Sequence, residues 1–135
     1  MKHSMVSLSI LCVDDERDIR DILARCLRVK GHKVDTASDG ASALLAVERK
    51  LRKDGISYDL VITDLKMPEM DGGRFLEEFR KKNITPEVIV YAGDLTPPEV
   101  ARVSKHRINA FIEKGDAMLI WACVDALAAP KLLRC

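Results

Sequence analysis

The chain has 135 residues, of which 47% are hydrophobic and 32% are charged, and its formal net charge is +1. This length suits a single domain with a real core, and the composition lacks the basic excess of nucleic-acid-binding proteins, so no direct binding of nucleic acid is expected. The first residues do not resemble a signal peptide and no apolar stretch is long enough to span a membrane, so we expect a cytoplasmic protein with no membrane partner.

Five short apolar runs alternate along the chain with longer stretches of helical periodicity. The expected strands are Ser7–Val13, Lys33–Thr36, Leu60–Thr63, Val88–Tyr91 and Ala110–Glu113. These runs lack the polar alternation of a half-exposed sheet, which is typical of strands that helices cover on both faces.

The stretches between the strands carry helical signals. The first has an apolar stripe of Ile19, Ile22, Leu23, Cys26 and Leu27 and stops at Gly31. Asp39 and Asp71 are expected to cap the next two helices, and Thr96 begins the fourth. The last helix runs from about Asp116 to near Pro130, with Met118 and Leu119 in its apolar stripe, and the basic segment 49–59 is expected to be a solvated loop.

These elements predict a (βα)5 order, which gives an α/β fold with a doubly wound, five-stranded parallel sheet and helices on both faces. We expect one domain across residues 1–135, with a core over about 8–128 and tails at 1–6 and 130–135. In such folds ligands bind beyond the carboxyl ends of the strands.

Charged residues gather at those predicted strand ends. Asp14 and Asp15 follow the first strand, Asp64 follows the third, and Lys114 follows the fifth. Carboxylates that converge repel each other and favour a bound hard cation, for which oxygen ligands indicate Mg²⁺. Acids after the first strand also disfavour a flavin or nucleotide site, which needs amide groups there for phosphate. A plain strand end or a solvated lysine would be the alternative for each residue taken alone.

Three segments together resemble the receiver domain of bacterial response regulators. They are VDDE at 13–16, VITDLKMPEMDG at 61–72 and FIEK at 111–114, within a similarity from about Leu8 to Leu127. The resemblance implies a flavodoxin-like, CheY-like sheet with strand order 2-1-3-4-5. It also implies a phosphoprotein of two-component (phosphorelay) signal transduction.

The resemblance assigns a role to each site residue. Asp64 would accept a phosphoryl group from a histidine kinase or a histidine phosphotransfer protein. Asp15, Asp64 and the backbone carbonyl of Lys66 would bind Mg²⁺ directly, and Asp14 would bind it through water. Lys114 and the backbone of Ala92 would contact the phosphoryl group. A downstream protein would bind the face formed by the fourth helix, fifth strand and fifth helix. A second copy of the chain, in a homodimer, is a further expected partner.

The sequence departs from this family at the switch. Tyr91 stands where receivers usually have Thr or Ser, and its ring is expected to compete for the space into which Phe111, at the position of the family's rotating aromatic, would turn. Gly115 stands where proline is common, and Arg107 lies near a helix end where glycine would relieve strain. We therefore expect the acceptor chemistry to be retained and the coupling of the switch to be altered.

Two other functions are compatible with parts of this pattern. A degenerate receiver would be a docking module that works without phosphorylation, and Tyr91 is the feature that favours it. A Mg²⁺-dependent phosphatase would need a second carboxylate two residues after the nucleophile, where this chain has Lys66. We therefore expect no enzyme activity beyond self-phosphorylation and self-dephosphorylation.

Overall fold

The computed structural model describes residues 6–129, which form five strands and five helices in strict alternation. The elements are β1 (Ser9–Val13), α1 (Arg17–Val29), β2 (Lys33–Ala37), α2 (Gly40–Asp54), β3 (Leu60–Thr63), α3 (Gly72–Lys81), β4 (Glu87–Ala92), α4 (Pro97–Ser104), β5 (Ala110–Glu113) and α5 (Ala117–Ala128). The predicted strands are all present, with boundaries that differ by two residues or fewer.

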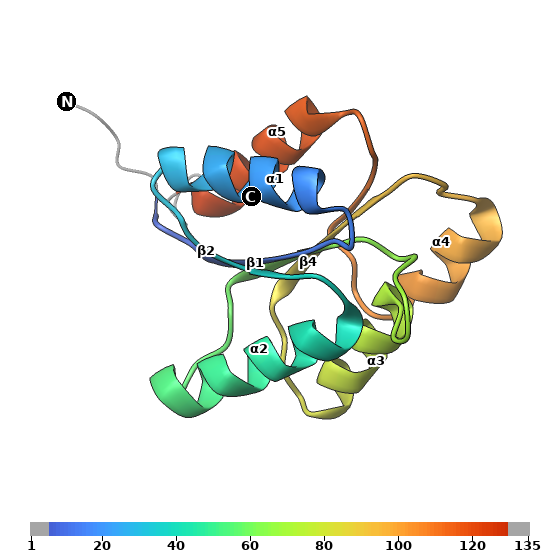
Figure 1. The fold of residues 1–135 in the computed structure, drawn as a ribbon, viewed down its shortest axis with the longest axis horizontal. Helices are drawn as coiled ribbons and strands as arrows, with labels where there is room; N and C mark the ends of the chain where they lie inside the picture. Colours follow the sequence, from blue (N-terminus) through green and yellow to red (C-terminus); the bar gives the residue numbers. More distant parts are fainter. Residues whose placement is uncertain (1–5, 130–135) are drawn as a thin grey trace.

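One parallel sheet with the strand order β2-β1-β3-β4-β5 forms the centre of the molecule. Helices α1 and α5 cover one face, while α2, α3 and α4 lie on the other (Figure 1). Strand β2 lies on one side of β1, and β3, β4 and β5 follow on its other side, so the strand order reverses between β1 and β3. The predicted doubly wound α/β fold and its strand order are confirmed.

Two apolar clusters fill the space between the sheet and its helices. Beneath α1 and α5, side chains such as Ile10, Leu27 and Ile120 are fully buried, and on the other face Phe75 and Phe79 pack edge to face with ring centres 4.9 Å apart. Because β1, β3 and β4 are covered on both sides, their side chains are buried almost without exception. The edge strands β2 and β5 are only partly covered, contrary to the expectation for all five strands.

Some residues of the predicted helical stripes face solvent. Ile22 is 59% exposed and Met118 is 75% exposed, and Leu119 is exposed too. In α1 the buried side chains are Leu23, Ala24 and Leu27, so the contact face is narrower than the run of apolar residues suggests. Hydrophobicity alone therefore overestimated the width of the buried stripe.

The segment 49–54 is helical rather than a loop, because α2 continues to Asp54 and ends at Gly55, whose φ is 75°. Its last turn carries Arg52 and Lys53, which favour the negative end of the helix dipole. The basic residues that suggested a solvated connection therefore belong to a helix C-terminus.

The predicted caps are present. The side chain of Asp39 accepts a hydrogen bond from the Ser42 amide, that of Asp71 accepts one from Arg74, and that of Thr96 accepts one from Glu99. Arg107 has a φ of 59°, as expected of a position that glycine would suit. Within residues 6–129, every helix is too short or too polar to cross a lipid bilayer.

Candidate phosphorylation and metal site

Asp14 and Asp64 lie side by side at the carboxyl edge of the sheet. They directly follow β1 and β3, which are neighbouring strands, and the amide of Asp64 donates to the carbonyl of Val13 over 2.9 Å. Asp14 is 1% exposed and Asp64 is 5% exposed. The parallel register thus places two acids together where little water can screen their charges.

Two further acids complete the cluster. Oxygen atoms from the carboxylates of Asp14, Asp15, Glu16 and Asp64 all lie within 4.8 Å of one another. The sequence predicted three of these residues but did not assign a role to Glu16. Its position directly after the acid pair was the available signal, and its amide hydrogen bond to Asp14 Oδ1, 2.9 Å long, turns the chain back toward the site.

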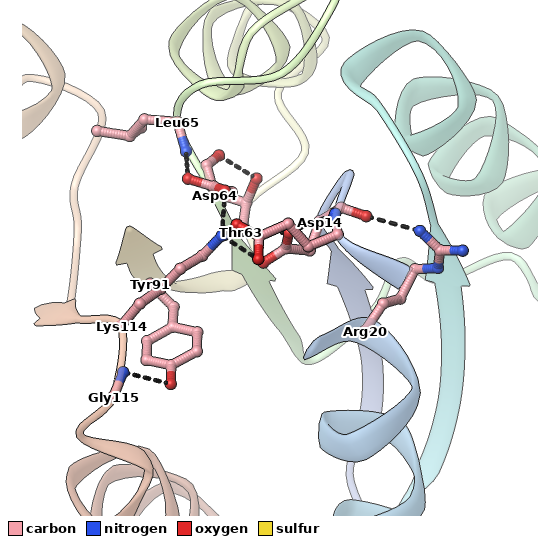
Figure 2. A network of polar contacts seen from close by, with 9 residues as sticks. Asp14, Arg20, Thr63, Asp64, Leu65, Tyr91, Lys114 and Gly115 are labelled. Carbon is pink, nitrogen blue, oxygen red and sulfur yellow. Dashed lines mark hydrogen bonds and ion pairs between the residues drawn. The ribbon is translucent and has the colours of Figure 1, made fainter. Parts of the chain in front are cut away.

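Lys114 supplies the positive charge of the site. Its Nζ atom lies 2.6 Å from Asp64 Oδ2 and 3.1 Å from Asp14 Oδ2 (Figure 2). It also lies 2.9 Å from Glu16 Oε1. Burial alone would lower the pKa of Lys114, but its hydrogen bonds to Asp64, Glu16 and Asp14 outweigh burial and raise it above its ordinary value. The lysine is therefore charged at neutral pH.

Asp14 has the opposite balance. Burial raises the pKa of Asp14, although hydrogen bonds from the Glu16 amide and from Lys114 favour the charged carboxylate. Arg20 binds the backbone carbonyl of Asp14 at 2.8 Å rather than its side chain. A cation bound at this carboxylate would favour its charged form and so oppose the effect of burial.

The loop after β3 presents Asp64 in a fixed orientation. The Leu65 amide donates to Asp64 Oδ1 at 2.7 Å, and the Thr63 hydroxyl donates to the Asp64 carbonyl at 2.8 Å. A Cβ atom at Gly72 would overlap that same carbonyl oxygen, so only glycine permits α3 to begin this close to Asp64. One oxygen of Asp64 is therefore held by the backbone while the other faces Lys114.

A hollow of about 220 Å³ lies over these residues. It is lined by Asp15, Glu16, Asp64, Leu65, Lys66, Ala92, Gly93, Asp94 and Lys114. The predicted backbone positions, Lys66 and Ala92, thus border the same space as the acids. The Lys66 side chain pairs with Asp94 across 3.6 Å at its exposed rim.

The donor set fits Mg²⁺. All four side chains offer carboxylate oxygen, the ligand type that Mg²⁺ and Ca²⁺ prefer, and no histidine or cysteine belongs to the cluster. The hollow also leaves room for water and for phosphoryl oxygens beside the carboxylates, as an octahedral Mg²⁺ site requires.

Tyr91 and Phe111 do not compete for space, which corrects the sequence-based expectation. Phe111 pairs in register with Val90, and Tyr91 with Ile112, so alternation along the strands places the two rings on opposite faces of the sheet. Tyr91 packs beneath α1 and α5, whereas Phe111 packs against the cluster on the other face. The Tyr91 hydroxyl instead accepts a hydrogen bond from the Gly115 amide at 3.0 Å.

The chain is thus a doubly wound parallel α/β domain with four clustered acids and a lysine at the carboxyl edge of its sheet. Residues 10–119 match the response regulator receiver domain, so the chain belongs to this family. It is 36% identical over 93 residues to the transcriptional regulatory protein TcrA of Mycobacterium tuberculosis, an alignment that covers 68% of this chain and 34% of TcrA.

Two other proteins are similar to this chain, one in sequence and one in fold. The sensor protein EvgS of Escherichia coli is 42% identical over 76 residues, which are 56% of this chain and 6% of EvgS. The crystal structure of the CheX–CheY–BeF3–Mg complex from Borrelia burgdorferi matches with a TM-score of 0.78 at 24% identity, covering 88% of this chain and 87% of that one. The chain thus spans about a third of TcrA and a small part of EvgS.

Proposed function

We propose that this receiver accepts a phosphoryl group on Asp64, in the cytoplasm, from the phosphohistidine of a histidine kinase or a histidine phosphotransfer protein, with Mg²⁺ as cofactor. The observation that carries the proposal is the convergence on Asp64, which is buried beside three further carboxylates and lies 2.6 Å from the ammonium of Lys114. Two relatives are named a transcriptional regulatory protein and a sensor protein, and these names support a role in signalling.

In the proposed reaction, an Asp64 carboxylate oxygen attacks phosphorus and the bond from phosphorus to the donor nitrogen breaks. The bonding electrons remain on the imidazole, which recovers its neutral form after proton uptake, and Asp64 becomes an acyl phosphate. Because the Leu65 amide binds Oδ1, the proposed nucleophile is Oδ2, the oxygen that faces Lys114 and accepts a hydrogen bond from its ammonium.

The surrounding residues have separate tasks in this proposal. Asp15, Asp64 and the Lys66 carbonyl are the proposed direct ligands of Mg²⁺, and Asp14 would bind it through water; the ion would neutralise charge on the carboxylates and the phosphoryl oxygens. Lys114 and the backbone of Ala92 contact the phosphoryl group. Both line the hollow above Asp64.

The proposed output is a change on the face formed by α4, β5 and α5, where Phe111 is partly buried and Met118 and Leu119 are exposed. A downstream protein, or a second copy of the chain, would bind this face. If this domain is part of a longer protein, we propose that the change on this face regulates the activity of that protein.

Intact mass spectrometry after incubation with acetyl phosphate and Mg²⁺ tests the acceptor. The expected result is a single phosphoryl adduct on the wild type and none on Asp64→Asn. Asp59→Asn is the matched control, because Asp59 precedes β3 at the opposite end of the same strand, where its side chain binds the Ser9 amide. No adduct on a wild type that binds Mg²⁺ would instead favour the degenerate, phosphorylation-independent docking module.

A further inference from the structure

Tyr91 joins β4 to the turn between β5 and α5. The residue is 6% exposed, its ring packs in the cluster beneath α1 and α5, and its hydroxyl reaches the Gly115 amide at 3.0 Å (Figure 2). Within residues 6–129, the lining of the hollow above Asp64 includes no serine, threonine or tyrosine. The Tyr91 hydroxyl thus binds the turn after β5. It does not replace the Thr or Ser hydroxyl that receivers commonly place beside the phosphoryl group.

Gly115 suits this contact in two ways. Its φ of 103° belongs to a region that glycine adopts without strain, and its N–H is free to donate to a side chain. Proline at this position would have neither the N–H nor the required φ. Tyr91 and Gly115, at which the chain departs from the usual receiver sequence, are therefore the acceptor and the donor of one hydrogen bond.

This bond lies next to Lys114. The amide of Lys114 itself donates to the Ala92 carbonyl at 2.9 Å, and the following amide, that of Gly115, donates to Tyr91. Both peptide groups that flank Lys114 are thus tied to β4, one to its backbone and one to its side chain. The Lys114 side chain, which is 13% exposed, then places its ammonium among three carboxylates.

We infer that Tyr91 is a positioning residue for Lys114, and that its hydroxyl fixes the β5–α5 turn so that the lysine ammonium faces Asp64. The catalytic consequence rests on the proposed phospho-acceptor function, whereas the positioning itself does not. Lys114 binds the carboxylates of Asp14 and Asp64, which are also proposed to hold Mg²⁺, so a loosened lysine would compete less with the ion. The same loosened lysine would stabilise an incoming phosphoryl group less well.

The variant Tyr91→Phe removes only the hydroxyl and is expected to produce opposite changes in two measurements. Loss of one hydrogen bond is expected to strengthen Mg²⁺ binding by about threefold in titration calorimetry, and to slow phosphorylation by acetyl phosphate by about fivefold. The Gly115 amide proton is expected to shift upfield in the NMR spectrum of the metal-free variant. Tyr58→Phe is the matched control, because Tyr58 is equally buried and its hydroxyl binds Asp35 at 2.7 Å, away from the site.

A double-mutant cycle shows whether Tyr91 acts through Lys114. Tyr91→Phe is expected to change Mg²⁺ affinity in the wild type and to leave it unchanged in a Lys114→Met background. Equal changes in both backgrounds, or weaker Mg²⁺ binding together with slower phosphorylation, would overturn the inference, because a merely structural tyrosine would loosen the whole site. If the wild type binds Mg²⁺ but takes up no phosphoryl group, the proposed function fails while the Mg²⁺ cycle still decides the role of Tyr91.

Discussion

The ammonium nitrogen of Lys114 lies 2.6 Å from Oδ2 of Asp64, although the two residues are separated by 50 positions in the chain. One residue follows β3 and the other follows β5, and β4 lies between those two strands. A long side chain is needed to cross that distance, which explains why a lysine rather than a shorter cation is found at the end of β5. In the metal-free site, the Lys114 ammonium offsets the negative charge of Asp64 and of the neighbouring carboxylates.

Removing this lysine is expected to destabilise the metal-free domain. Lys114→Met leaves the nearly buried carboxylates of Asp14 and Asp64 without a counter-ion, at a cost of about 3 kcal/mol in the free energy of unfolding. Urea denaturation in EDTA measures this loss, and added Mg²⁺ is expected to recover most of it. Lys66→Met is the control, because Lys66 is an exposed partner of Asp94 and is expected to cost less than about 1 kcal/mol. Equal losses for the two variants would contradict the account.

Glycine at position 72 is expected to be required for the loop that carries Asp64. Gly72→Ala places a Cβ against the Asp64 carbonyl, a backbone atom that cannot move without shifting the nucleophile. We expect a loss of about 3 kcal/mol in thermal unfolding and a weaker affinity for Mg²⁺. Gly93→Ala borders the same hollow but meets no atom within 4 Å, so it is expected to leave stability nearly unchanged. A stable Gly72→Ala variant with wild-type Mg²⁺ affinity would refute this.

His32 is expected to make stability depend on pH. Burial lowers the pKa of His32 below its ordinary value of 6.5, with Asp125 opposing and Lys30 adding to the effect. Its Nδ1 accepts the Leu8 amide at 3.0 Å, which requires an unprotonated Nδ1 atom. The unfolded chain therefore binds a proton more readily, and the stabilisation is complete above the unfolded pKa and is lost as pH falls through the folded pKa.

The measurement is urea unfolding between about pH 7.5 and 5, compared with His32→Gln, which has no titrating group. Wild type is expected to lose more stability than the variant as the pH falls. Parallel curves would show that His32 does not contribute.

Arg107 offers a stabilising substitution. Its φ of 59° costs a residue with a Cβ roughly 1 kcal/mol, part of which glycine recovers despite its larger entropy loss on folding. Arg107→Gly is expected to raise the melting temperature slightly and to leave Mg²⁺ affinity unchanged. The Arg107 carbonyl that accepts from Arg80 is a backbone group and is retained. A fall in melting temperature would mean that the arginine side chain contributes more than the strain costs.

Much of the fold was predictable because local signals agreed with the global pattern. The caps at Asp39 and Asp71 and the apolar runs of β3 and β5 each specified their elements. The acids at 14 and 64 were predictable as neighbours, since parallel strands bring their carboxyl ends to one edge. The exposure of Ile22 and Met118 was not, because it depends on how the helices sit against the sheet.

The errors at the site have one physical origin. The face toward which Tyr91 points depends on strand register, and a shift of one residue reverses it. The sequence shows Tyr91 and Gly115 as two separate departures, whereas the structure joins them through a hydrogen bond across two strands. Contacts of this kind depend on three-dimensional distances that spacing along the chain does not contain.

The most direct test of the central claim is to locate the phosphorylated residue. The wild-type protein would be treated with acetyl phosphate and Mg²⁺, reduced with borohydride, which converts an aspartyl phosphate to homoserine, and sequenced by tandem mass spectrometry. The account predicts homoserine at position 64 and aspartate at 14, 15 and 59. Modification at another carboxylate, or an unmodified Asp64 in protein that binds Mg²⁺, would contradict it.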